Sequence, residues 1–156
     1  LEFRRVLFRS RLKMHNKKIL IIDDSRTIRE GLKNQLIHIG IPVTNIHTTD
    51  NGKQGIEETN LKHYDIVFVD YEMPEMNGEE FTELIRKKET GSEEQTKIVL
   101  ITSVAERKDI INMLRKGINN YIIKPIEETK VKEKLIYTLG LEDKYITPKT
   151  DDSEDK

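Results

Sequence analysis

The feature that most constrains the fold is a series of short apolar runs, rich in β-branched residues, that each end abruptly in a polar residue. Ile-Leu-Ile-Ile leads directly into Asp23 and Asp24, and Ile-Val-Phe-Val leads into Asp70. Two later runs end at Thr102 and at Lys124. Runs of this length and composition are typical of strands buried on both faces of a parallel sheet. We therefore expect parallel strands that carry polar groups at their carboxyl ends.

Segments with helical periodicity lie between these runs. Residues 27–39 carry one apolar stripe that ends at Gly40, and Pro42 prevents the helix from resuming. A weaker strand is expected at 43–48, a turn at Asn51-Gly52, and a last strand at 120–123. Four further helices are expected, with these residues on their buried faces: Ile56 and Leu61; Phe81, Leu84 and Ile85; Ile110, Ile111 and Leu114 in 106–116; Val131, Leu135 and Leu139 in 128–139. Five strands that alternate with five helices predict a doubly wound α/β fold.

Length and composition narrow the function classes. A chain of 156 residues is typical of one domain. The sequence holds no cysteine, which excludes disulfides, thiol catalysis and thiolate metal sites. A formal net charge of -1 gives no general nucleic-acid signal, and no apolar run approaches the length of a membrane span.

The two ends of the chain differ from the middle. Residues 1–13 are basic and resemble the translation of a sequencing-adapter oligonucleotide, so we interpret them as a non-native leader and Met14 as the natural start. Residues 142–156 are polar and acidic, and we expect them to be disordered. The domain itself is expected to span 17–141.

The polar residues at the strand ends predict a ligand site. The carboxyl ends of parallel strands meet at one edge of an open sheet, where ligands bind. Asp23, Asp24 and Asp70 would repel one another there unless a divalent cation and the ammonium of Lys124 balanced their charge. The alternative for Lys124 is an ordinary surface lysine, but its place at a strand end before proline favours the site.

Taken together, these motifs resemble the receiver domains of two-component response regulators, including those of chemotaxis. The resemblance covers about residues 17–141 and depends on the order of its pieces: Asp23-Asp24, Asp70 followed by Met73-Pro74 and Gly78, Thr102-Ser103, and Tyr121-Ile-Ile-Lys124-Pro125. It implies a flavodoxin-like, five-stranded parallel sheet of order 2-1-3-4-5 with five helices. It also implies a cis Lys124-Pro125 bond.

The resemblance assigns roles to the acidic residues. Asp70 would accept a phosphoryl group and form an acyl phosphate. Mg²⁺ would be bound directly by Asp24 and Asp70, mostly through water by Asp23, and by the backbone carbonyl of Glu72.

It assigns further roles to residues of the last two strands. Lys124 would pair with Asp70 at rest and with the phosphoryl oxygens afterwards. Thr102 would donate a hydrogen bond to the phosphoryl group, and Tyr121 would be the switch aromatic that turns inward with it. Read alone, Thr102 and Tyr121 are ordinary strand residues.

The family also implies partners and location. The phosphoryl donor would be a sensor histidine kinase or a phosphotransfer protein, and phosphorylation would remodel the face made by the fourth helix, fifth strand and fifth helix, with homodimerisation as one outcome. We expect a cytoplasmic protein without direct nucleic-acid or membrane binding. It would not be a conventional enzyme, because its chemistry is limited to its own phosphorylation and dephosphorylation.

Several alternatives remain open at this point. The domain could be a phosphorylation-independent binding module, or a phosphate sink without a conformational output. A phosphatase of the haloacid-dehalogenase type needs a second aspartate two residues after the nucleophile, where this chain has Glu72. A flavodoxin-like nucleotide binder needs a glycine-rich loop after the first strand, where Asp23-Asp24-Ser25 stands instead. Arg26 and Arg29 are expected on the solvated face of the first helix.

Overall fold

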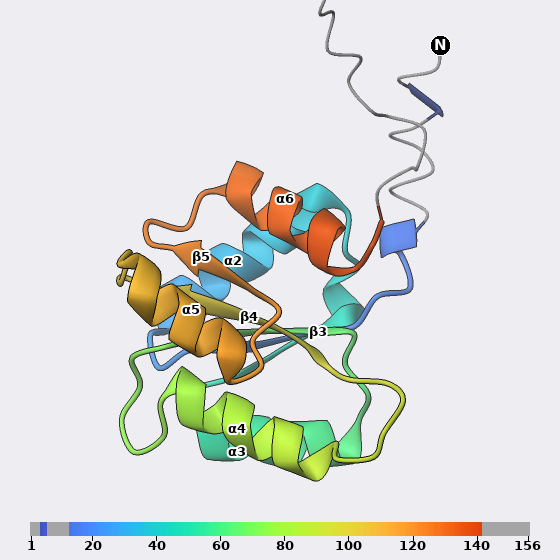
Figure 1. Cartoon of the computed structure of the whole chain (residues 1–156). Helices are drawn as coiled ribbons and strands as arrows, with labels where there is room; N and C mark the ends of the chain where they lie inside the picture. The colour runs from blue at the N-terminus through green and yellow to red at the C-terminus, as the bar shows by residue number, and fades with distance from the viewer. Residues whose placement is uncertain (1–3, 6–12, 142–156) are drawn as a thin grey trace, which may run out of the picture.

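The computed structural model contains a five-stranded parallel sheet of order β2-β1-β3-β4-β5 (Figure 1). It describes residues 4–5 and 13–141, so most of the predicted leader and all of the predicted acidic tail lie outside the described residues. The strands are β1 (Ile19–Ile22), β2 (Ile46–Thr49), β3 (Ile66–Asp70), β4 (Lys97–Thr102) and β5 (Asn120–Ile123). The helices are α2 (Arg26–Ile39), α3 (Gly52–Leu61), α4 (Gly78–Lys88), α5 (Arg107–Arg115) and α6 (Glu128–Thr138), with a 3₁₀ turn η1 (Val43–Asn45). The predicted fold class and strand order are confirmed.

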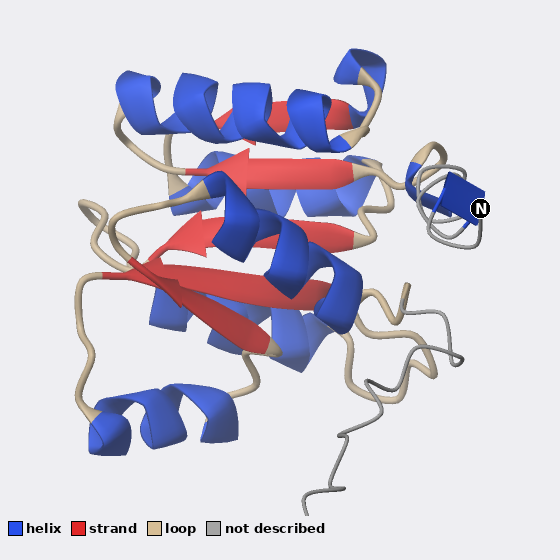
Figure 2. Ribbon diagram, turned by 90° about the horizontal axis from the view of Figure 1, so that it is seen from above, coloured by secondary structure: helices blue, strands red, loops and turns tan. Residues whose placement is uncertain are grey.

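The strand register brings the carboxyl ends together. All strands point to the same edge of the sheet (Figure 2). Ile22 pairs with Val69, and Asp70 pairs with Ile101 on the neighbouring strand. Thr102 in turn pairs with Ile123, the residue before Lys124. The polar residues that end these runs are therefore neighbours across the sheet, as the sequence predicts.

Two hydrophobic layers cover the sheet because its strands alternate apolar side chains between the faces. Helices α2 and α6 lie on one face and α3 and α4 on the other (Figure 1). Leu32, Leu36, Val131 and Leu135 pack on the first face, where Met14 also joins the core. The second face packs against a set drawn largely from α4, α5 and the α5–β5 loop: Phe81, Ile85, Ile110, Met113 and Ile118.

Local sequence signals set the helix ends. Ser25, Asn51 and Asn77 are N-caps whose side-chain oxygens accept hydrogen bonds from Ile28 N, Gln54 N and Glu80 N. Asn51-Gly52 therefore starts α3 directly, where the sequence predicted only a turn. Gly40 ends α2 with φ of 126°, a conformation that favours glycine.

For four residues the prediction of a buried position is wrong. Leu61, Leu84, Ile111 and Leu114 are exposed, the first of them to 77%. In α5 the buried pair is Ile110 and Met113 instead, since four apolar residues in five positions permit two different stripes and the contact with the sheet selects one. The second strand also starts later than predicted, at Ile46, because η1 occupies the preceding residues.

None of the helices in the described part of the chain is both long enough and apolar enough to cross a membrane.

Candidate functional site

Three carboxylates converge at the carboxyl edge of the sheet. Asp23 and Asp24 follow β1, and Asp70 is the last residue of β3. Each offers a carboxylate oxygen within 4.8 Å of the others, in the only such acidic group among residues 4–5 and 13–141. Asp23 and Asp70 are only 1% and 3% exposed, whereas Asp24 is exposed to solvent. The predicted acidic cluster is therefore present and open on one side.

Asp23 is fixed by the start of α2. Its Oδ1 accepts a hydrogen bond from Ser25 N at 2.8 Å, while its buried Oδ2 has no partner. Burial raises the pKa of Asp23 from 3.8 to about 6, and the negative charges of Asp70 and Asp24 add to this rise against the opposing effects of the Ser25 amide and Lys124. An oxygen that is buried, charged and unpartnered is suited to a cation.

Lys124 partly neutralises the cluster. Its Nζ lies 2.9 Å from Asp70 Oδ1, although this oxygen accepts no well-aligned hydrogen bond, so we describe the contact as an ion pair. Burial raises the pKa of Asp70 more than Lys124 lowers it. Burial acts to lower the pKa of Lys124, but its ion pair with Asp70 and the negative charges of Asp23 and Glu72 outweigh this effect and raise it. One ammonium thus faces three carboxylates.

The donor set fits a divalent cation. Hard carboxylate oxygens are the ligands that Mg²⁺ prefers, and Asp23 Oδ2 and Asp70 Oδ1 both lack hydrogen bonds. Glu72, two residues past Asp70, has an exposed side chain whose charge contributes a minor rise to the pKa of Asp70. The predicted contribution of its backbone carbonyl stays a prediction.

Thr102 is the last residue of β4, and Tyr121 lies two residues before the end of β5. Thr102 is 1% exposed, and its Oγ1 accepts a hydrogen bond from Val104 N at 3.0 Å. The backbone carbonyl of Thr102 accepts a hydrogen bond from Lys124 N at 2.8 Å, which joins the end of β4 to the loop after β5. Tyr121 is half-buried and packs against the core on the α4 and α5 face. The Lys124-Pro125 bond is cis, as the resemblance implies.

The loop after β3 is shaped around the cluster. A Cβ on Gly78 would lie 2.6 Å from Asp70 O and equally close to the side chain of Leu100. Only glycine therefore lets α4 begin directly beside the end of β3, where Gly78 N donates to Tyr71 O at 3.0 Å.

Comparison with known proteins agrees with this geometry. The sequence profile of the response regulator receiver domain matches residues 19–136. The chain belongs to the response regulator receiver domain family. A receiver domain is not a conventional enzyme, and this one has the family's acidic pocket.

Curated relatives of this receiver domain are chemotaxis regulators. It is 33% identical to the chemotaxis protein CheY1 of Helicobacter pylori over 81% of this chain and 99% of the relative. It is 34% identical to the CheY homologue of Campylobacter jejuni over 79% of this chain and 92% of that one.

Solved structures show the same fold. A two-component response regulator from Clostridium difficile is 28% identical with a TM-score of 0.70, over 80% of this chain and 97% of that one. CheY4 of Vibrio cholerae, at 23% identity, also has a TM-score of 0.70 over 79% of this chain and 98% of that one, which shows likeness of fold.

Sequence reasoning missed the role of Arg29 in this receiver domain. Arg26 is exposed as predicted, but Arg29 is half-buried and its Nη1 donates to Asp23 O at 2.7 Å. The guanidinium thus helps to anchor the backbone at the acid pair. Its place one helical turn after Ser25, the N-cap of α2, was the available signal.

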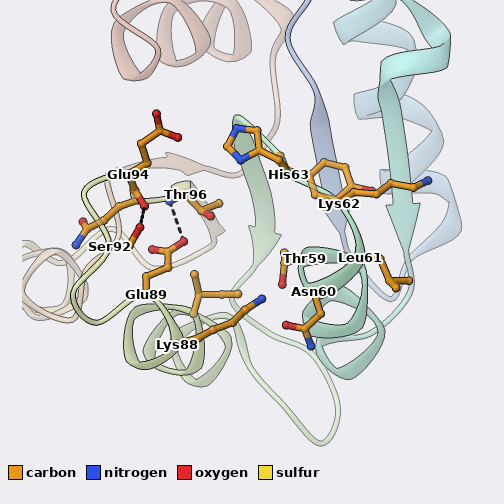
Figure 3. A pocket seen from close by; sticks show the side chains of 13 residues that line it. Thr59, Asn60, Leu61, Lys62, His63, Lys88, Glu89, Ser92, Glu94 and Thr96 are labelled. Atoms are coloured by element: carbon orange, nitrogen blue, oxygen red, sulfur yellow. Dashed lines mark hydrogen bonds between the residues drawn. The ribbon is translucent and has the colours of Figure 1, made fainter.

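A pocket of about 390 Å³ lies at the opposite end of the sheet (Figure 3). Its walls come from the end of α3, the end of α4 and the loop before β4, and include Lys62, His63, Lys88 and Glu94. No acidic triad lies there within the described residues. The strand-end cluster, and not this pocket, has the groups that the family's chemistry requires.

Proposed function

We propose that this receiver domain accepts a phosphoryl group on Asp70 from the phosphohistidine of a sensor histidine kinase or a phosphotransfer protein. The observation that carries the proposal is the buried Asp70 carboxylate at a strand end, with Lys124 Nζ 2.9 Å from Oδ1 and two further acids beside it. A carboxylate oxygen of Asp70 attacks phosphorus, the P–N bond to the imidazole breaks, and the imidazole nitrogen keeps the bonding electron pair.

Asp23, Asp24, Asp70 and the backbone carbonyl of Glu72 would hold Mg²⁺ in this proposal. Bound there, the ion supplies positive charge to the equatorial oxygens of the transferring group. Asp70 needs to be ionised to attack, and the neighbouring ammonium of Lys124 favours that state. After transfer, the same ammonium is placed to interact with the new phosphoryl oxygens.

Thr102 and Tyr121 would convert the modification into a change of surface. Thr102 would exchange its bond with Val104 N for one with the phosphoryl group, and Tyr121 would turn inward. The outward side chains of Ile111 and Leu114 on α5 support a binding face there, because both are apolar and exposed. A second copy of the chain or a separate partner would bind this face, in the cytoplasm where the phosphoryl donors act.

Intact-mass measurement tests the phosphoacceptor. Incubation with acetyl phosphate and Mg²⁺ should add one phosphoryl group to the wild-type protein and none to Asp70→Asn. Chelation of the metal should abolish the adduct of the wild-type protein. Glu57→Gln, an exposed carboxylate on α3, is the matched control and should be modified like the wild type.

A full adduct on a folded Asp70→Asn variant would refute the assignment. Thermal melts of the variant establish that it is folded. Phosphorylation of Asp70 in the wild-type protein with no conformational change elsewhere would instead favour the phosphate-sink alternative.

A further inference from the structure

We infer that Lys134 is a positioning residue that holds the half-buried Tyr121 ring in its resting position and so sets how readily the receiver switches. This inference rests on the proposed function, in which Tyr121 turns inward when Asp70 is phosphorylated. Helix α6 packs beside β5 (Figure 1). Lys134 of α6 places its Nζ over the ring of Tyr121, 5.0 Å from the ring centroid.

The geometry is that of a cation–π contact. An ammonium within about 6 Å of the face of a tyrosine ring is attracted by the negative charge of that face. Lys134 is partly buried, and within the described part of the chain no carboxylate forms an ion pair with it. Lys130, one turn earlier on the same helix, lies 3.9 Å from Glu127 instead. The ammonium of Lys134 is therefore directed to the ring alone.

The contact crosses the edge of the sheet. Tyr121 packs with the core on the α4 and α5 face, whereas α6 belongs to the opposite layer. Since β5 is the edge strand, the Lys134 side chain passes around it to reach the ring. In the proposed switch, inward rotation would carry the ring farther into this core and away from Lys134.

The interaction therefore exists in only one of the two states. A contact shifts an equilibrium by the difference in its strength between the states, so this one stabilises the resting state and opposes switching. The hydrogen bond from Val104 N to Thr102 Oγ1 belongs to the same resting arrangement, and in the proposed function Thr102 exchanges it for one with the phosphoryl group. Removal of Lys134 should release one of these two restraints and leave the acidic cluster intact.

Ring-labelled tyrosine NMR measures the switch directly. The Tyr121 signal is assigned with Tyr121→Phe, and beryllofluoride, a stable mimic of the phosphoryl group, is titrated with Mg²⁺. Lys134→Met should reach half conversion at a beryllofluoride concentration about two- to fivefold lower than the wild type, the effect expected of a cation–π contact that solvent still reaches. Lys134→Arg keeps the cation and should titrate like the wild type.

Lys132→Met is the matched control, because Lys132 is an exposed lysine of the same helix with no ring contact. The inference is overturned if the wild-type ring signal responds but all three proteins, Lys134→Met, Lys132→Met and the wild type, reach half conversion at the same beryllofluoride concentration. If the wild-type ring signal does not move although intact mass shows phosphorylation of Asp70, the switching part of the proposed function fails, and the role of Lys134 fails with it. Loss of the mass adduct itself would identify a failure of the phosphoacceptor assignment.

Discussion

The two ends of the sheet hold polar clusters that differ in how many of their charged and polar atoms have hydrogen-bond partners. At the carboxyl end, Asp23 Oδ2 and Asp70 Oδ1 are buried without hydrogen bonds. At the amino end, Arg86 of α4 donates from Nε and Nη2 to Gly117 O and from Nη2 to Asn119 Oδ1, and its Nη1 is paired with Glu89 at 2.8 Å. Thr96 N completes the second cluster by donating to Glu89 Oε1.

The difference shows what each cluster does. Satisfied charges at the amino end bind the loops before β4 and β5 to α4, so that cluster contributes to stability. Unsatisfied charges at the carboxyl end lower the stability of the metal-free protein and leave a site for a cation. Stability and chemistry are thus assigned to opposite ends of the same strands.

The largest effect should come from the amino end. Arg86→Met leaves the nearly buried Glu89 unpaired, so the free energy of unfolding should fall by about 3 kcal/mol. Urea denaturation measures this loss. Phosphorylation by acetyl phosphate should continue under native conditions, because the site lies at the other end of the sheet.

Arg26→Met is the control for this substitution. Arg26 forms an exposed pair with Glu30, and pairs of that kind contribute little. Equal losses for the two variants would contradict the view that burial makes the Arg86 cluster structural.

Magnesium should act only at the carboxyl end. At ten times its dissociation constant, the ion should add about 1.4 kcal/mol to the free energy of unfolding of the wild type. Asp24→Asn should lose most of this gain, and the exposed control Glu57→Gln should keep it. Thermal melts with and without Mg²⁺ measure the gain, and an undiminished gain in Asp24→Asn would exclude Asp24 as a ligand.

The smallest effect concerns pH in the absence of metal. The folded-state pKa of Asp23 is about 6, above its ordinary 3.8, so the folded state binds more protons between these values. Stability contributed by this protonation is present below about pH 4 and is lost as pH rises through about 6. Asp23→Asn removes the charge and should be more stable than the wild type at neutral pH.

Urea midpoints of the two proteins across this pH range check the prediction. The difference between the variant and the wild type should grow from acid to neutral pH, whereas Glu57→Gln should show no such trend. A difference that is constant with pH would mean that the titration of Asp23 is not its cause.

Much of the carboxyl end could be predicted from the sequence. Short apolar runs that stop at Asp70 or Thr102 predict buried parallel strands and the edge at which their polar ends meet, because side-chain alternation is local and the helices between the runs provide the crossovers that make the strands parallel. The family resemblance then supplied the strand order and the cis Lys124-Pro125 bond, both of which the structure contains.

The faces of the helices could be predicted only in part. One stripe in α2 was unambiguous, and the structure buries Leu32 and Leu36 as expected. The apolar residues of α5 were compatible with two stripes, and the sheet buried Met113 while Leu114 faces outward. Helical periodicity fixes the angles between side chains but not the direction from which the sheet approaches.

By itself, the sequence determined the strand runs, the end of α2 at Gly40 and the convergence of Asp23, Asp24 and Asp70, since these depend on neighbouring residues and on the shared direction of the strands. Only the tertiary structure decided which oxygens are unpartnered, how burial raises the pKa of Asp23 and Asp70, and which distant groups meet. Arg86 forms a hydrogen bond with Asn119, which lies 33 positions later in the sequence, and Lys134 contacts the ring of Tyr121 around the edge of β5. Such contacts depend on how the layers pack, and no local pattern in the sequence encodes them.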